Sequence, residues 1–270
     1  MIYDITVIGG GPSGATAAEQ LSKKGFKVAL IDRAGRIKPC GGAIPPRLIE
    51  DFEIPQSQLV AKIKTARMIS PTNRKVDIPI ENGYVGMVDR EFFDEYLRER
   101  AGKRGAKRFT GTFVNLYKSS EYTKVDFNNH STKKISTLLT RYVIGADGAS
   151  SIVRNETTAF ETIKYPSAFY LCDTPLYGDK DFIRLAHYHF SKLGFMVVVP
   201  LAKDNIHRCM LMSDQNLEFM YAEGLFEEAN IKAGPPTWES RYSIYCGIVD
   251  QYQNGRLILA GDAAHLHSPF

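Results

Sequence analysis

Residues 3–14 read Tyr-Asp-Ile-Thr-Val-Ile-Gly-Gly-Gly-Pro-Ser-Gly, an apolar run that ends in a glycine-rich turn. The apolar run predicts a short buried strand over residues 3–8, and the spacing of apolar residues after the turn predicts a helix over residues 15–24. A second apolar run, over residues 27–31, ends at Asp32. Strand, helix and strand at this spacing predict a parallel βαβ unit.

Three more elements are predicted farther along the chain. Residues 62–69 and 75–80, separated by Ser-Pro-Thr-Asn, predict a β-hairpin. Residues 90–104 predict an amphipathic helix, and residues 216–232 predict another helix. The apolar side of the first of these helices is expected to comprise Phe92, Phe93, Tyr96 and Leu97.

The glycine-rich turn has the spacing of a dinucleotide-binding site. Gly9 permits the tight turn, Gly11 lets a pyrophosphate approach the backbone, and Gly14 lets the helix pack close to the strand. Pro12 and Ser13 lie where the helix opens, and a helix N-terminus presents free N–H groups and partial positive charge to phosphates. We therefore predict that these five residues bind a dinucleotide.

Asp32 stands at the end of the second strand, where a carboxylate can accept hydrogen bonds from a ribose diol. This position favours an adenosine 2′-hydroxyl over a 2′-phosphate. We also place the neighbouring Arg33 in the site. The structural alternative is a turn that only shapes the chain, followed by a surface aspartate.

Two later turns each carry an aspartate after a predicted strand. Residues 145–154 read Gly-Ala-Asp-Gly-Ala-Ser-Ser-Ile-Val-Arg, and residues 261–269 read Gly-Asp-Ala-Ala-His-Leu-His-Ser-Pro. The first resembles the Asp-Gly-x-x-Ser-x-Val-Arg pattern of the flavoprotein monooxygenases and their relatives. The second resembles the Gly-Asp-Ala-Ala-His-x-x-x-Pro signature of the flavin aromatic hydroxylases. The resemblance implies that the bound dinucleotide is FAD.

The same resemblance assigns roles to residues of both turns. It implies that Asp147 and Gly148 lie near the FAD pyrophosphate and that Arg154 lies near a passing nicotinamide nucleotide. Gly261 and Asp262 are expected at the ribityl chain. The alternative for the first turn is an aspartate that caps a helix. His265 and His267 either face a ligand or have a structural role, and we assign no catalytic residue.

Residues 38–46, Lys-Pro-Cys-Gly-Gly-Ala-Ile-Pro-Pro, resemble the geranylgeranyl reductases, and the resemblance covers about the first 155 residues. It continues through residues 67–73 and 84–90. The resemblance implies that a segment beside the flavin ring or ribityl chain contains three residues, Cys40, Gly41 and Ala43. It also implies the following contacts elsewhere on FAD: Arg90 with the phosphate region and the Val114 backbone with the adenine. The alternative for Cys40 is a small buried hydrophobe.

The second half of the chain resembles a different branch. Residues 194–200, Gly-Phe-Met-Val-Val-Val-Pro, and the histidine after Gly-Asp-Ala-Ala are typical of aromatic hydroxylases. Three hypotheses stay open: a reductase that transfers hydride from reduced flavin to a prenyl double bond, an O₂-dependent aromatic monooxygenase, and an inert FAD-binding fragment or chimera. Because there is no second glycine-rich fingerprint, NAD(P)H is expected as a transient co-substrate.

The strand pattern predicts an α/β protein with a discontinuous domain organisation. The fold class expected is a Rossmann-like FAD-binding domain, with a parallel sheet of the glutathione-reductase type and an inserted, mainly antiparallel substrate domain. The FAD-binding domain is expected to comprise residues 1–58, 84–158 and 254–270. Residues 59–83 and 159–253 are expected to form the substrate domain.

Composition sets wider limits. The net charge of +4 is weak evidence for nucleic-acid binding, and the spacing of the four cysteines predicts neither a metal site nor a disulfide framework. The substrate is expected to be a small molecule or a lipid, and the location cytoplasmic. Six basic residues at a predicted helix end suggest a solvated face or a peripheral membrane contact: Arg98, Arg100, Lys103, Arg104, Lys107 and Arg108. Because the chain starts directly in a strand, we expect no signal peptide. Because it ends at Phe270, before a helix expected to face the flavin, we expect a fragment or chimera.

Overall fold

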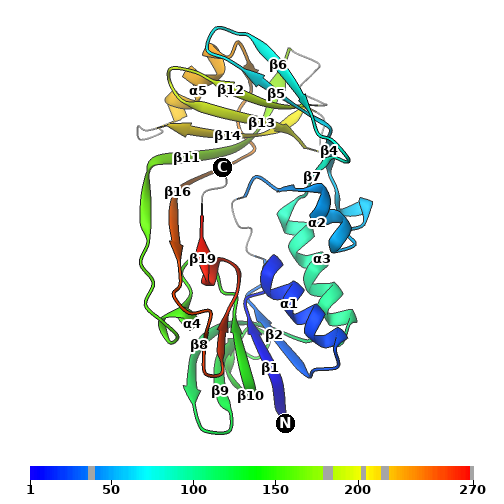
Figure 1. Ribbon diagram of the computed structural model, residues 1–270, viewed down its shortest axis with the longest axis vertical. Coiled ribbons are helices and arrows are strands. Elements are labelled where there is room, and N and C mark those ends of the chain that lie inside the picture. The colour runs from blue at the N-terminus through cyan, green and yellow to red at the C-terminus, as the bar shows by residue number, and fades with distance from the viewer. Residues whose placement is uncertain (36–39, 179–184, 202–204, 214–218, 268–270) are drawn as a thin grey trace. The chain divides into compact units, whose positions relative to one another are not determined.

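The computed structural model describes residues 1–35, 40–178, 185–201, 205–213 and 219–267. The chain forms two compact units, each made of separate segments (Figure 1). The first unit comprises Met1–Ile37, Glu91–Ile163 and Tyr245–Phe270. The second comprises Lys38–Arg90 and Lys164–Ile244.

A seven-stranded sheet forms the centre of the first unit. Its strands are β1 (Ile2–Ile8), β2 (Val28–Asp32), β8 (Lys107–Lys118), β9 (Thr123–Asn129), β10 (Lys134–Gly145), β17 (Gln253–Asn254) and β18 (Leu257–Leu259). Neighbouring pairs from β8 through β2, β1 and β10 to β18 are parallel. The outer half of β8 pairs with β9, and β9 with β10, in antiparallel fashion. The predicted parallel sheet, including its late third and fourth strands, is confirmed.

Two helices cover one face of this sheet, α1 (Pro12–Lys23) and α3 (Arg90–Lys103). Ala18 of α1 and Ala101 of α3 pack into one buried cluster with the strand residues Val7 and Leu30. Small side chains at the helix positions allow close approach to the strands. On α3 the predicted apolar side was partly wrong: Phe93 is buried, but Phe92 is 69% exposed.

Short elements complete the first unit. Ser151 is the N-cap of α4 (Ile152–Asn155), and the short 3-10 helix η3 (Gly261–Ala263) is followed by β19 (His265–Leu266). The end of β16 (Trp238–Ile248) pairs with β19. Residues of these segments close a second buried cluster against β8, β9 and β10, on which Val153 and Ala263 are fully buried.

A mainly antiparallel sheet forms the second unit, with the order β16-β11-β14-β13-β12-β5-β6. Its strands besides β16 are β5 (Thr65–Ile69), β6 (Lys75–Pro79), β11 (Ile163–Tyr177), β12 (Ala186–Phe190), β13 (Phe195–Pro200) and β14 (Ile206–Ser213). β12 pairs with β5 in parallel, and the hairpin predicted for β5 and β6 is present. Helix α5 (Phe219–Glu228) packs Leu225 and Phe226 against one face of the sheet. The sequence predicted this helix over residues 216–232, of which residues 216–218 lie outside the described ranges. The observed helix ends at Glu228, four residues earlier than predicted, and β15 (Lys232–Ala233) follows.

A small three-stranded sheet also belongs to the second unit. It consists of β3 (Ala43–Ile44), β7 (Val85–Met87) and β4 (Ala61–Ile63), with α2 (Pro46–Asp51) and the turn η1 (Gln56–Gln58) between them. The sequence placed residues 38–58 and 84–90 in the FAD-binding domain. The contacts place them in the second unit, because β3 and β4 both pair with β7. In the described ranges every helix is too short or too polar to span a lipid bilayer.

Candidate functional site

The glycine-rich turn has the shape that a bound pyrophosphate requires. Gly9 has φ +100°, and a side chain there would collide with the carbonyl of Ala146. A side chain at Gly14 would collide with the carbonyl of Gly9, whereas one at Gly11 would meet no atom within 4 Å. Two glycines are therefore needed for packing inside the protein, and Gly11 leaves open space on the side where a ligand can approach.

Helix α1 begins at Pro12, within the glycine-rich turn and three residues earlier than predicted. Gly11 is its N-cap and provides no side-chain cap, so side chains do not occupy the N–H groups of the first turn. Pro12 occupies the first helical position, and Ser13 is exposed. These groups fit an anionic ligand.

The two aspartate turns lie against the glycine turn within the first unit. A side chain at Gly9 would meet Cα of Asp147 at 2.9 Å. Gly261 has φ +60°, and a side chain there would meet Oγ of Ser13 at 2.9 Å. Three turns that are far apart in sequence therefore converge, with Asp262 partly exposed among them. This convergence is the arrangement that the sequence predicted for one extended dinucleotide.

Asp147 also has the structural role that sequence analysis left as an alternative. Its Oδ2 accepts hydrogen bonds from the backbone N–H groups of Ile152 at 2.8 Å and Val153 at 3.3 Å. Its Oδ1 accepts a 2.5 Å hydrogen bond from Ser151 Oγ, which in turn caps Arg154 N. The carboxylate therefore anchors α4. Gly148, with φ +91° and open space around it, is the part of this turn that is free for a ligand.

Arg154 connects the two aspartate turns from inside the protein. Its guanidinium donates to the carbonyl oxygens of Ala149 at 2.7 Å and Ala263 at 3.1 Å and stacks on Phe160 at 3.9 Å. Burial lowers the pKa of Arg154, against the nearby charge of Asp147. Arg154 is only 6% exposed and is held by these backbone contacts, and its contact with a passing nicotinamide nucleotide stays a prediction.

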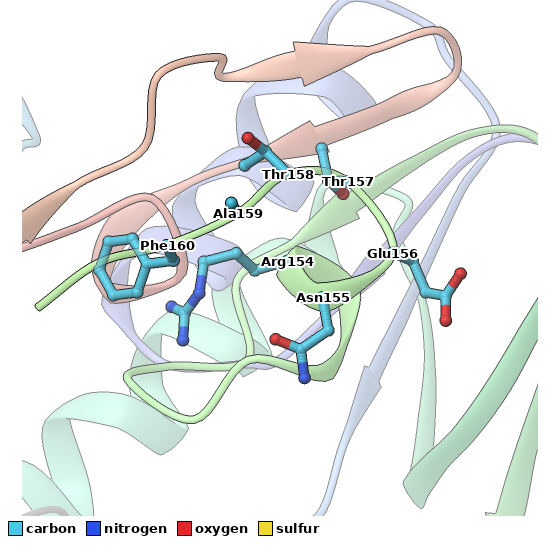
Figure 2. A pocket seen from close by; sticks show the side chains of 7 residues that line it. All are labelled: Arg154, Asn155, Glu156, Thr157, Thr158, Ala159 and Phe160. Carbon is cyan, nitrogen blue, oxygen red and sulfur yellow. The ribbon is translucent and has the colours of Figure 1, made fainter.

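Figure 2 shows the surface pocket beside this arginine, about 530 Å³ in volume and lined by residues 154–160. The guanidinium of Arg154 points toward the ring of Phe160 rather than outward. The pocket is lined mainly by a polar turn. We assign it no ligand.

Asp32 and Val114 have geometries that suit their predicted ligands. Asp32 Oδ2 accepts a 2.7 Å hydrogen bond from Gly10 N, which places the carboxylate beside the glycine turn. Val114 is the extra residue of a β-bulge in the β8–β9 ladder, which skips from Phe113 to Asn115. The bulge removes the Val114 backbone from the regular pairing, as a backbone contact with adenine would require. Arg33 is exposed.

The Cys-Gly-Gly segment belongs to the second unit. Cys40 is partly buried, its Sγ accepts from Gly42 N at 3.5 Å, and its carbonyl accepts from Arg208 at 3.0 Å. A side chain at Gly41 would meet the sulfur of Met210 at 2.9 Å, so the segment packs directly against β14. These packing contacts fit the small-hydrophobe alternative, and a place beside the flavin stays a prediction.

Two more predicted residues occupy element ends. Ala43 is exposed in β3, where it pairs with Met87, and Arg90 begins α3 and is partly buried.

The two histidines after the second aspartate turn lie in or next to a strand. His265 pairs with Ile248 through β19. Since His265 also stacks with His267 at 5.8 Å, these two histidines have a structural explanation. Among the described residues, no group of three or more His, Cys, Asp or Glu side chains could hold a metal ion.

Three of the six residues in the predicted basic face are buried or half-buried and are paired with carboxylates. Arg98 is 8% exposed, Arg100 pairs with the buried Glu19 at 2.8 Å, and Arg108 pairs with Glu95 at 2.7 Å. Sequence analysis missed Arg98 as a site residue. Its position in the helix could have indicated burial. Arg98 lies on the same face of α3 as the buried residues Phe93, Leu97 and Ala101. The remaining three basic residues are exposed, and membrane contact through them stays a prediction.

Comparison with known proteins identifies the family. Residues 2–270 match the model of the FAD binding domain family. The geranylgeranyl diphosphate reductase of Rhodobacter capsulatus is 46% identical over the whole chain, which covers 70% of that protein.

Solved structures show the same fold at low identity. The p-nitrophenol 4-monooxygenase of Pseudomonas putida DLL-E4 superposes with a TM-score of 0.82 at 17% identity, covering 99% of this chain and 74% of that one. A geranylgeranyl bacteriochlorophyll reductase-like protein of Thermoplasma acidophilum gives 0.76 at 19%, covering 97% and 71%. The sequence similarity to the reductase therefore extends over both halves of the chain, whereas the likeness to the monooxygenase is one of fold. The chain is an FAD-dependent oxidoreductase that belongs to the FAD binding domain family and, within it, to the geranylgeranyl reductases.

Proposed function

We propose that this protein reduces prenyl double bonds of a geranylgeranyl-type substrate, using FAD that NAD(P)H has reduced. The observation that carries the proposal is the 46% identity to the Rhodobacter capsulatus geranylgeranyl diphosphate reductase along the entire chain. The aromatic hydroxylases share the fold at under 25% identity, which supports the architecture alone. The resemblance of residues 190–270 to the aromatic hydroxylases is therefore weaker support for a function than the reductase identity along the whole chain.

The first unit supplies the groups that would bind the nucleotide half of FAD. In the proposal, the glycine turn and the α1 N-terminus receive the pyrophosphate, and Asp32 receives the adenosine ribose. The two aspartate turns contribute Gly148 and Asp262 to the remaining polar parts of the cofactor. The geometry that supports this is the convergence of the three turns and the open space at Gly11.

The second unit supplies an apolar surface around the Cys-Gly-Gly segment. Met210 lies against Gly41, and Phe169 stacks on Tyr242 with ring centroids 5.6 Å apart. Burial, with a smaller contribution from Cys40, raises the pKa of Tyr242 to about 12, which keeps its hydroxyl neutral at physiological pH. Thioether and aromatic side chains adapt to irregular apolar ligands. Such a surface suits a branched prenyl chain.

Bound FAD in its reduced form would supply a hydride to one carbon of the double bond, and a proton from solvent would complete the reduction at the other carbon. The chain's own contribution in this proposal is to orient the cofactor through the three turns. The apolar residues beside Cys40 would bind the prenyl chain, which has no polar group to be held by.

The proposal is tested with purified holoenzyme under anaerobic conditions. NADPH or NADH should bleach the flavin, and addition of geranylgeranyl diphosphate should reoxidise it. Mass spectrometry should show the substrate gaining one hydrogen molecule per double bond reduced. The FAD-free apoprotein is the control.

Two outcomes would overturn the proposal. If phenolic substrates stimulate both NAD(P)H oxidation and O₂ uptake while prenyl substrates remain unchanged, the protein is an aromatic monooxygenase. If FAD binds normally but neither nicotinamide nucleotide bleaches it in the presence of any of these substrates, the chain is an inert FAD-binding protein.

A further inference from the structure

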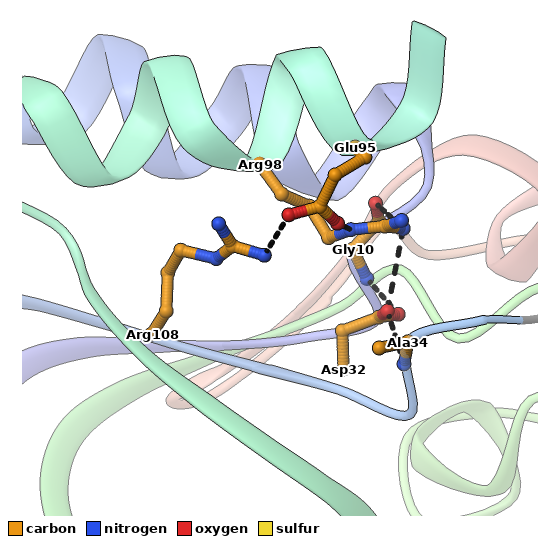
Figure 3. Close-up of polar contacts among 6 residues, drawn as sticks. All are labelled: Gly10, Asp32, Ala34, Glu95, Arg98 and Arg108. Atoms are coloured by element: carbon orange, nitrogen blue, oxygen red, sulfur yellow. Dashed lines mark hydrogen bonds and ion pairs between the residues drawn. The ribbon is translucent and has the colours of Figure 1, made fainter. Parts of the chain in front are cut away.

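Helix α3 places a buried arginine directly behind the glycine turn. Figure 3 shows Arg98 reaching from α3 to Gly10 and Asp32. Its Nη1 donates to the carbonyl of Gly10 at 3.2 Å and lies 3.3 Å from Oδ1 of Asp32. Its Nε donates to Glu95 at 2.8 Å. One side chain therefore contacts both the turn and the acid that the fold provides for a dinucleotide.

Asp32 is held by three donors yet keeps acceptor capacity. Oδ2 accepts from Gly10 N at 2.7 Å, and Oδ1 accepts from Ala34 N at 2.9 Å beside the Arg98 contact. A carboxylate has about four acceptor sites. Because Oδ2 has one partner among the described residues and the side chain is 23% exposed, it can still accept from a ribose hydroxyl.

Glu95 and Arg108 hold the arginine in this position. Arg108 donates to Glu95 at 2.7 Å on the side opposite Arg98. Although burial works against it, the hydrogen bonds from Arg108 and Arg98 keep the pKa of Glu95 below its ordinary value. The four charged groups are formally neutral together. Without Arg98 the cluster would present an excess negative charge beside an anionic cofactor.

We propose that Arg98 is a positioning residue for FAD, which fixes the Asp32 carboxylate for the adenosine ribose diol and neutralises it next to the pyrophosphate. The inference rests on the proposal that Asp32 holds that ribose. Arg98 itself does not touch the cofactor. It acts through Asp32 and through the Gly10 carbonyl, which fixes the peptide between Gly9 and the open Gly11.

The test measures FAD affinity of the apoprotein by flavin fluorescence quenching, which requires no turnover. Loss of a hydrogen-bonded charge contact predicts that Arg98→Gln weakens FAD binding about tenfold. With an FAD analogue that lacks the adenosine 2′-hydroxyl, the same substitution should weaken binding markedly less. Asp32→Asn combined with Arg98→Gln should lose less affinity than the two single losses multiplied. Arg98→Lys should restore part of the affinity.

Lys103→Gln is the matched control, because Lys103 lies on the same helix with its side chain 78% exposed. It should leave the affinity unchanged. Equal losses for FAD and the deoxy analogue, or fully multiplicative losses in the double variant, would overturn the role of Arg98. If Arg98→Gln does not fold, Arg98→Lys is compared with both ligands instead. An Asp32→Asn variant with unaltered affinity would sink the ribose assignment itself, and neither outcome depends on prenyl reduction.

Discussion

Each of the two units contains an arginine that contacts an aspartate and the carbonyl of a glycine-containing loop, but the two pairs differ in geometry. In the second unit, Arg208 makes two parallel hydrogen bonds of 2.8 Å to Asp173, a bidentate arrangement within the sheet, and both side chains are at most 14% exposed. In the first unit, Arg98 lies 3.3 Å from one oxygen of Asp32, whose side chain is 23% exposed at a strand end. The Asp173 carboxylate is therefore enclosed within the sheet, whereas the Asp32 carboxylate stays accessible to a ligand.

The difference separates a structural pair from a ligand-binding one. Arg208 and Asp173 lie on adjacent strands in register, so they tie β14 to β11, and the spare Nη1 holds the Cys40 carbonyl. Although burial disfavours the charge, Asp173 raises the pKa of Arg208 above its ordinary value. A fixed carboxylate that stays accessible at a strand end, beside an open glycine, indicates a binding site more clearly than burial alone does.

The largest expected effect is on the bidentate pair of Arg208 and Asp173. Asp173→Ala leaves the Arg208 charge buried without its partner and should lower the free energy of unfolding by about 4 kcal/mol, measured by urea denaturation. Replacing both residues, with Asp173→Leu and Arg208→Met, should recover most of that loss. A single substitution that costs no more than an exposed one would mean that the pair is solvated and that the comparison fails.

A smaller effect distinguishes the two kinds of glycine in the turn. Gly11→Ala should leave the thermal stability of the apoprotein unchanged and weaken FAD binding about a hundredfold, or ~2.7 kcal/mol, because the methyl group occupies the space left for the pyrophosphate. Gly14→Ala should destabilise the apoprotein itself, since its methyl group meets the Gly9 carbonyl. Unchanged FAD affinity in Gly11→Ala would place the pyrophosphate elsewhere.

The smallest effect concerns a buried base in the second unit. Burial, then the charges of His187 and Lys75, lower the pKa of His189 to about 4. As the pH falls below about 6.5, His189 binds a proton in the unfolded chain but stays neutral in the folded protein. This contribution to stability is therefore fully present above pH 6.5 and is lost between pH 6.5 and 4. His189→Gln should reduce the stability loss between pH 8 and 5 by up to about 2 kcal/mol. The exposed His130, changed to Gln, is the control, and an identical loss in both variants would contradict the low pKa.

The sequence predicted the parts of the fold that depend on local patterns. The βαβ unit, the strand that enters residue 145 and the strand at Leu257 were recognisable because buried parallel strands are continuous apolar runs. The hairpin of β5 and β6 followed from its turn residues. The three turns were correctly expected to converge, because the carboxyl ends of parallel strands meet at one edge of a sheet.

Long-range polar contacts could not be predicted in the same way. Arg98 and Arg108 looked like a solvated helix end, since nothing local shows that Glu95 and Asp32 lie within reach. Similarly, a pattern cannot reveal that the Arg154 side chain turns inward. Phe92 was placed on the apolar side of its helix because neighbouring aromatics share hydrophobicity, whereas a helix turns by about 100° per residue and carries it outward.

The bond from Arg154 to Ala263 joins positions 109 residues apart in the chain. During synthesis the turn around Asp147 leaves the ribosome well before its partner carbonyl exists, so until η3 is made the guanidinium lacks one of its acceptors. Closing so long a loop is an entropic cost that only the later docking of η3 repays. Acquisition of FAD is therefore expected to follow synthesis of η3, so that bound cofactor would report that the two turns have docked.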